Sequence, residues 1–215
     1  MITPSSVTML ILAYLFGSIP TAVWIGKAFY GIDVREYGSG NAGATNTFRV
    51  LGKRAGIPVM MIDILKGFGA TNLAYFIGAS ITGGPHSNLV TYQLALGIAA
   101  VMGHLFPVFA GFRGGKGIAT LFGMVLAVNL SAALLCVSIF IIVLLVTRYV
   151  SLSSIFGGFT YLVGVSLIYN KNTNNMVVIF GMCICLLILV THQKNIERLL
   201  KGKESKVNLF KRKEA

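Results

Sequence analysis

Long apolar segments separated by short polar ones run through nearly the whole 215-residue chain. The first, from Val7 to Gly26, contains no charged residue, and as a helix it is about 30 Å long, enough to cross the hydrocarbon core of a bilayer. The pattern returns at 57–80, 89–109, 117–147, 155–169 and 176–191. It predicts an all-α protein, a polytopic bundle of transmembrane helices.

The segment 117–147 is too long for one ordinary span. It carries no charge, and as a single helix it would extend about 46 Å, whereas a hydrocarbon core is about 30 Å thick. A single helix would also place Lys116 and Arg148 on opposite sides of the membrane. A turn near Asn129, Leu130 and Ser131 returns both cations to one side, in keeping with the excess of basic residues in cytoplasmic loops. We therefore expect two short helices here and seven spans in all.

The composition agrees with this interpretation. Hydrophobic residues make up 55% of the chain, charged residues only 11%, and the mean hydropathy is +0.80, values that exclude a soluble globular domain. Because apolar segments recur along the chain, they are not a lone cleavable signal peptide. The three cysteines lie within apolar segments and indicate neither a disulfide nor a metal site. We expect one membrane domain over 1–215, with a basic cytoplasmic tail from about residue 193.

The net charge of +12 comes from 18 basic and 6 acidic residues. Sixteen of the basic residues flank the predicted spans on one side, while Lys171 lies on the other side and Lys66 lies within a span. Because Lys and Arg are in excess on the cytoplasmic side, we expect the N-terminus outside and the C-terminus inside. This distribution explains the charge without a nucleic-acid partner, and the tail cations are expected to contact anionic membrane lipids.

Three polar segments lie on the predicted cytoplasmic face, and the first reads SGNAGATNTFR over 39–49. Its glycines permit tight turns with exposed N–H groups. Ser39, Asn41 and Asn46 supply hydrogen-bond donors and acceptors, and the guanidinium group of Arg49 has a geometry suited to phosphate. The segment is therefore a candidate anion site, and the alternative is a flexible loop between two helices.

The second polar segment reads GFRGGKGIAT over 111–120. It is not a Walker motif, because the first Gly and the final Ser or Thr of GxxxxGK[ST] are replaced by Ala and Gly. The backbone N–H groups of Gly114, Gly115 and Gly117 could still approach an anion. Lys116 supplies a positive charge, and a helix beginning at Ile118 would point its positive end to the same place. A plain basic loop is the alternative.

The third polar segment, HQKNIERLLKGKE over 192–204, follows the last span. His192 and Asn195 are three residues apart and share one helical face. The alternative is a helix end whose polar residues lie in the membrane interface. Asp63 and Lys66, also three apart, lie inside a predicted span, where we expect them to pair as a structural brace or as functional groups.

Together the three segments resemble those of the PlsY family, the bacterial acyl-phosphate:glycerol-3-phosphate acyltransferases. The resemblance covers nearly the whole chain and rests on SGNAGATNTFR, GGKGIAT preceded by GHLFPVF, and HxxNIxRLxxGxE. It implies a seven-helix enzyme of the bacterial inner membrane with its active site facing the cytoplasm. Such an enzyme moves an acyl chain from acyl phosphate to the 1-hydroxyl of glycerol 3-phosphate, giving lysophosphatidic acid and phosphate, and no cofactor is expected.

The resemblance also implies roles for individual residues. The candidates for binding glycerol 3-phosphate are Ser39, Asn41, Asn46, Arg49, Lys116, Ser154, His192 and Asn195. Gly114, Gly115 and Gly117 would hold the acyl phosphate. Lys116 and His192 are the candidate catalytic residues. Lys116, with backbone amides, would stabilise the developing oxyanion and the departing phosphate, while His192 would either bind substrate or act as general base.

A small polytopic organic-anion transporter is the alternative from another class. Buried charges, glycine-rich breaks and short helices also occur in carriers. A carrier, however, would hold its site near the membrane midplane, whereas the polar segments of this chain collect on one predicted face. A membrane scaffold without enzymatic activity is the third possibility, and alanine at Arg49 or Lys116 would leave its function unchanged.

Overall fold

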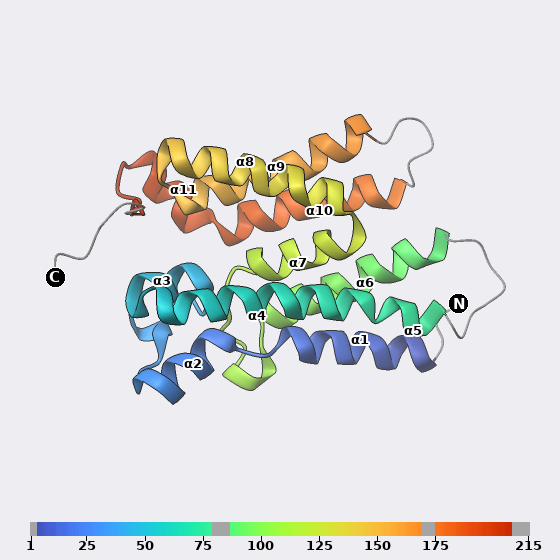
Figure 1. Ribbon diagram of the computed structural model, residues 1–215, viewed down its shortest axis with the longest axis horizontal. Coiled ribbons are helices and arrows are strands. Elements are labelled where there is room, and N and C mark those ends of the chain that lie inside the picture. The colour runs from blue at the N-terminus through green and yellow to red at the C-terminus, as the bar shows by residue number, and fades with distance from the viewer. Residues whose placement is uncertain (1–3, 79–86, 169–174, 208–215) are drawn as a thin grey trace. The chain divides into compact units, whose positions relative to one another are not determined.

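The computed structural model describes residues 4–78, 87–168 and 175–207, and its regular elements within those ranges are all helical (Figure 1). The chain divides into two compact units, Met1–Leu130 and Ser131–Ala215. The predicted helix ends at residues 80 and 169, Lys171 and the tail beyond 207 lie outside the described residues. The helical class predicted from the apolar pattern is confirmed.

Unit 1 contains seven α-helices within its described residues, and two 3₁₀ turns. The helices are α1 (Pro4–Gly17), α2 (Thr21–Tyr30), α3 (Ala44–Leu51), α4 (Lys53–Asn72), α5 (Ala74–Gly78), α6 (Ser87–Leu105) and α7 (Ile118–Val128). The turns are η1 (Val34–Glu36) and η2 (Val108–Ala110). Helix α4 is central, since it packs against α1, α3, α6 and α7 (Figure 1).

Small residues let these helices approach closely. A Cβ atom at Gly67 of α4 would overlap the carbonyl oxygen of Thr120 in α7, and one at Gly123 of α7 would overlap the carbonyl oxygen of Ile64 in α4. Helices in membranes associate through such close backbone contacts, because lipid offers no hydrophobic driving force between them. The glycines therefore fix the contact between α4 and α7.

A break at Leu73 divides the predicted helix 57–80 into α4 and α5, and three further breaks lie at Pro20, Pro107 and Asn129. Two agree with the sequence interpretation: α6 ends before Pro107, and α7 ends before Asn129, whose backbone is extended. The third lies inside the apolar run 7–26, where α1 ends at Gly17 and α2 begins at Thr21. Pro20 causes this break, because proline has no N–H to donate to the preceding helical turn.

Unit 2 contains α8 (Leu130–Thr147, which begins at its border), α9 (Val150–Ile168), α10 (Asn175–Thr191) and α11 (Gln193–Leu200). Tyr161 of α9 meets Phe180 of α10 edge-on, with ring centroids 5.8 Å apart. The chain bends by 63° between α10 and α11. His192 occupies the bend, so a residue that the sequence placed on a helical face lies at a helix junction.

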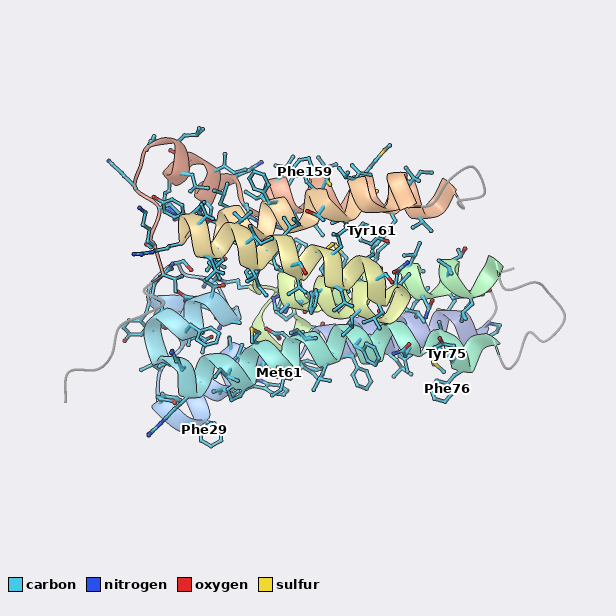
Figure 2. All side chains as sticks on the ribbon, turned by 45° about the horizontal axis from the view of Figure 1, so that its top comes forward. Phe29, Met61, Tyr75, Phe76, Phe159 and Tyr161 are labelled. Atoms are coloured by element: carbon cyan, nitrogen blue, oxygen red, sulfur yellow. The ribbon has the colours of Figure 1, made fainter. Side chains whose placement is uncertain are left out.

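The exterior of the helices is largely apolar. Figure 2 shows Met61 on α4 and Tyr75 and Phe76 on α5 with their side chains projecting from the ribbon, and all three are exposed. Phe29 on α2 is 78% exposed. Exposed apolar side chains of this size and number are unfavourable in water and suit contact with lipid.

Three helical segments of the described chain are long and apolar enough to cross a membrane: Pro4–Tyr30, Leu89–Ala110 and Leu130–Thr147. The bent pair formed by Val177–Thr191 and Gln193–Leu200 would provide a fourth. Helix α4 begins at Lys53, four residues before the predicted start at Ile57, and so includes more charge than the apolar run. The structure thus supports a helical membrane protein with three to four clear spans.

Candidate anion site

The first two polar segments lie together in unit 1. The backbone N–H of Ala42 donates to the carbonyl oxygen of Gly114 at 3.4 Å. The position of a Cβ atom on Gly115 would be 3.0 Å from the carbonyl oxygen of Ala42. Two segments that are about 70 residues apart in sequence therefore form one backbone surface, which the sequence alone could only place on the same side of the membrane.

Asn46 holds the first segment in shape. Its Oδ1 accepts from the backbone N–H of Ser39 at 2.8 Å, and its Nδ2 donates to the carbonyl oxygens of Val34 at 2.8 Å and Tyr37 at 3.1 Å. The side chain is buried, and these bonds use most of its hydrogen-bonding capacity. Asn46 therefore fixes the turn at Gly38, whose φ is +63°.

The remaining candidates of the first segment are more accessible. Asn41 donates through Nδ2 to the carbonyl oxygen of Ser39 at 3.3 Å, and both residues are half-buried. Arg49 is exposed on α3, three residues after Asn46 and on the same helical face. The segment thus presents a hydroxyl and an amide beside the turn that Asn46 braces, and a guanidinium group on the exposed surface of α3.

The glycine segment is fixed by its own backbone. The N–H of Gly114 donates to the carbonyl oxygen of Leu105 at 3.1 Å, and that of Gly115 donates to the carbonyl oxygen of His104 at 3.2 Å. The sequence interpretation assigned these N–H groups to an anion, whereas in this structure both donate to carbonyl oxygens at the open end of α6. The two glycines instead allow the loop to lie directly on that helix end.

The start of α7 offers the donors that Gly114 and Gly115 do not. Gly117 precedes the helix with φ +77°, a left-handed conformation that favours glycine. The first amides of a helix have no carbonyl partner within it, and they carry the positive end of the helix dipole. Lys116, half-buried, stands immediately before this turn. The predicted cation and the predicted helix start therefore meet at one place.

Asp33 and Arg35 hold the other end of the glycine segment. Arg35 donates through a terminal nitrogen to the carbonyl oxygens of Ala110 at 2.7 Å and Arg113 at 3.1 Å, and it pairs with Asp33 at 2.7 Å. The side-chain hydrogen bonds from Arg35 hold the pKa of Asp33 well below its usual range, although partial burial opposes this. The sequence analysis missed both residues, since they stand outside the conspicuous glycine-rich motifs.

A buried polar network lies inside unit 1. Asp63 and Lys66 are paired as predicted, with Lys66 Nζ 2.8 Å from Asp63 Oδ1. Thr21 donates to the same carboxylate oxygen at 3.1 Å, and Lys66 also donates to the carbonyl oxygen of Ile19 at 2.9 Å. His104 Nδ1 is 3.7 Å from Asp63 Oδ1. The pair thus braces the break between α1 and α2 and faces the end of α6.

The other predicted residues belong to unit 2. His192 is buried, and its Nδ1 is 2.9 Å from the carbonyl oxygen of Ile188. Asn195, also buried, donates to Glu204 Oε1 at 2.6 Å. Ser154 is buried on α9, where its hydroxyl donates to the carbonyl oxygen of Val150 at 2.9 Å. The structure thus groups the candidates into two sets, one in each unit.

Glu204 organises the set in unit 2. Its carboxylate accepts from Asn195, from the hydroxyl of Ser151 at 2.8 Å and from Arg198 Nε at 2.8 Å. Burial acts to raise the pKa of Glu204, but these hydrogen bonds and the charge of Arg198 outweigh it, so the pKa is lowered. The sequence analysis included Glu204 in its third motif without giving it a role.

The chemistry available is that of anion binding. In unit 1 the described residues supply Arg49, Lys116 and the start of α7, together with hydroxyl and amide groups. Within the described ranges, no group of three or more His, Cys, Asp and Glu side chains is placed to hold a metal ion. Fold and site thus define a class, a helical membrane protein with a cationic, glycine-lined site.

Comparison with known proteins identifies the family. Residues 7–202 match the family model described as glycerol-3-phosphate acyltransferase, and the chain belongs to that family. It is 40% identical to the glycerol-3-phosphate acyltransferase of Chlorobium phaeobacteroides, over 94% of this chain and 96% of the relative. It is 42% identical to the enzyme of the same name from Enterococcus faecalis, over 94% and 92% of the two chains.

Two solved structures have the same fold. The crystal structure of PlsY, an integral membrane glycerol 3-phosphate acyltransferase, in its glycerol 3-phosphate form, matches with a TM-score of 0.83 and 38% identity. The lysophosphatidic acid form matches with a TM-score of 0.80 and 36% identity. Each match covers 95% of this chain and 96% of the other. The family resemblance stated from the sequence motifs is confirmed.

Proposed function

We propose that this protein transfers an acyl chain from acyl phosphate to the 1-hydroxyl of glycerol 3-phosphate, releasing lysophosphatidic acid and phosphate in phospholipid synthesis. The observation that carries the proposal is the junction of the SGNAGATNTFR and GGKG segments through Ala42 and Gly114. It gathers Arg49, Lys116 and the positive end of α7 into one unit. Two phosphorylated substrates require such a concentration of positive charge.

Different residues of unit 1 would serve the two substrates. Ser39, Asn41 and Arg49 would bind glycerol 3-phosphate, with Asn46 shaping the turn that carries them. Gly117 and the first amides of α7 would receive the phosphate of the acyl donor, and Lys116 would neutralise it. In this arrangement Gly114 and Gly115 contribute close backbone packing rather than donors, in agreement with their bonds to the end of α6.

The reaction needs little covalent help from the protein. The substrate hydroxyl attacks the acyl carbonyl, negative charge develops on the carbonyl oxygen, and phosphate departs. Lys116 and backbone amides would stabilise both charges. Acyl phosphate is an activated donor, so its own phosphate would accept the hydroxyl proton, and acyl-CoA would not replace it.

Unit 2 holds further candidates for binding glycerol 3-phosphate. Ser154, His192 and Asn195 are buried side chains with hydrogen-bonding groups. The contact of His192 Nδ1 with the carbonyl oxygen of Ile188 at 2.9 Å fixes the orientation of the imidazole ring. His192 would then bind the glycerol moiety, or act as the base if the phosphate of the donor does not.

The proposal places one domain of seven spans in the bacterial inner membrane, with the N-terminus outside, the C-terminus inside and the site facing the cytoplasm. Sixteen basic residues on one side of the predicted spans support this orientation. Both substrates are anionic, whereas the acyl chain and the product belong in the bilayer. A cationic site at the cytoplasmic surface suits all of these molecules.

The choice of donor tests the proposal. Purified protein in lipid is supplied with glycerol 3-phosphate and either acyl phosphate or acyl-CoA, and phosphate release and CoA release are measured. We expect turnover with acyl phosphate only. Turnover with acyl-CoA would show that the donor is wrong, and no turnover with either donor in a folded preparation would favour the organic-anion transporter.

A further inference from the structure

His104 contacts the glycine loop with both its backbone and its side chain. Its carbonyl oxygen accepts from the N–H of Gly115 at 3.2 Å. Its imidazole Nε2 is the atom nearest to the position that a Cβ on Gly115 would take, closer than normal contact permits. Gly114 also packs on the His104 carbonyl. The ring and the backbone of His104 thus both pack directly against the GGKG turn.

The opposite edge of the same ring faces Asp63. His104 Nδ1 is 3.7 Å from Asp63 Oδ1, slightly beyond hydrogen-bond distance. Among the described residues Nδ1 has no hydrogen-bond partner, although it is buried. A buried polar atom normally has a partner. Asp63 is the group toward which this nitrogen can donate after a small shift.

Asp63 is itself held firmly. Lys66 and Thr21 contact its Oδ1 at 2.8 and 3.1 Å, and Lys66 also binds the carbonyl oxygen of Ile19. Asp63 is 1% exposed and His104 is 6% exposed. Burial of this extent keeps His104 from serving as an open binding group, so it can act on substrate only through the loop above it.

We propose that Asp63 and His104 form a positioning pair that fixes the GGKG turn, and with it Lys116 and the first amides of α7, for the phosphate group of the acyl donor. This inference rests on the proposed acyl transfer and adds two positioning residues to the site. The network beneath them connects the break between α1 and α2 to the glycine loop. It gives the loop a rigid base that a glycine-rich turn lacks by itself.

The pair should affect one substrate more than the other. Removal of the imidazole leaves an empty space beside Gly115. The loop can then move into this space, and Lys116 moves with it away from the position in which it would contact the donor phosphate. Misplacement of a binding group by about 1 Å costs up to about 100-fold in rate, so we expect the KM for acyl phosphate to rise about tenfold or more in His104→Ala. The KM for glycerol 3-phosphate should change less, because Asn46 braces that segment through its own hydrogen bonds to Ser39, Val34 and Tyr37.

The first experiment measures both KM values and kcat in lipid for the wild type, His104→Ala, His104→Gln and Asp63→Asn. The Gln amide can take the place of Nε2 beside Gly115, so His104→Gln should recover much of the loss in KM for acyl phosphate. A purely structural defect would lower the amount of folded enzyme and leave both KM values unchanged. Unchanged KM values for acyl phosphate, or equal increases for both substrates, would overturn the pairing, whereas an inactive wild type would instead reject the proposed function.

A second experiment tests the contact between the ring and the loop. Gly115→Ala should also raise the KM for acyl phosphate, because its methyl group would meet the imidazole. In a His104→Ala background the same change should cost clearly less, since the ring is gone, and the difference is the coupling between the two positions. Gly69→Ala, whose methyl group would meet nothing within 4 Å, is the matched control. Equal effects of Gly115→Ala in both backgrounds would overturn the proposal.

Discussion

Glu204 is the residue on which the polar side chains of unit 2 converge. The chain reverses after α11 through Gly202, whose φ is +65°, and this turn returns the carboxylate to Asn195 and Arg198. A charged acceptor with several donors is more stabilising than a neutral one. The position of Asn195, a candidate substrate-binding residue, therefore depends on an acid that follows it by nine residues.

Glu204→Gln should destabilise unit 2 by about 2 kcal/mol, because the amide cannot accept from all three donors. The folded-state pKa of Glu204 is lowered from its ordinary value of 4.5, so the stability due to its ionisation is complete above that pH and is lost as the pH falls toward the folded-state pKa. Thermal unfolding at several pH values, measured in detergent, checks this. A Gln variant that loses as much stability below pH 4.5 as the wild type would contradict it.

At the level of the elements, the contact between α4 and α7 sets the position of the glycine turn, because α7 begins at that turn. Gly67 and Gly123 bring the two backbones together. Helix α7 has only 11 residues, about 16 Å of helix, so it has little other surface with which to anchor itself.

Gly67→Ala should therefore destabilise unit 1 by about 1–3 kcal/mol, since its methyl group would overlap the Thr120 backbone. Gly69→Ala, two residues along the same helix, should be neutral or stabilising by up to about 1 kcal/mol, because its methyl group meets no atom and alanine is the better helix former. Thermal unfolding of the two variants in one detergent is the measurement. Similar melting temperatures for both variants would show that α4 and α7 are not in close contact.

Some of the helix ends could be predicted from the sequence, and others could not. The breaks at Pro107 and Asn129 were predicted, one from proline chemistry and the other from excessive length. The break at Pro20 was not, because the run 7–26 has the length of a single span, which favours one unbroken helix in spite of the proline. Helix α4 begins earlier than predicted because Lys53 and Arg54 were counted as loop charges, whereas a helix can extend beyond the apolar core.

The sequence offers candidate residues for the site but few of their contacts. Motif resemblance supplied Arg49, Lys116 and His192, but not the bonds of Gly114 and Gly115 to the end of α6. Those bonds depend on tertiary structure, since the partners are separated by about ten residues that fold back on themselves. The roles of Arg35 and Glu204 were missed for the same reason, because each has a hydrogen-bond partner that is distant from it in sequence.

At the scale of the whole molecule, orientation is the property to test. Single cysteines are introduced at Lys53 and Arg113, after the native Cys136, Cys183 and Cys185 have been replaced by serine. Both positions should react with membrane-impermeant reagents only when those reagents have access to the cytoplasmic face, because cationic loops remain inside the cell. A cysteine at Thr82, in the connection predicted to be outside, should react in intact cells. Labelling of Lys53→Cys or Arg113→Cys in intact cells would contradict the proposed topology.

The most direct test of the acyl transfer is the formation of its product. Wild-type protein, Lys116→Ala and the control Gly69→Ala are each reconstituted in lipid with acyl phosphate and isotopically labelled glycerol 3-phosphate, and lysophosphatidic acid is measured by mass spectrometry. We expect labelled product from the wild type and the control, and a reduction of about 100-fold or more in Lys116→Ala, as follows from loss of a charge that stabilises the transition state. Labelled product at the wild-type rate from folded Lys116→Ala would contradict the account of this site.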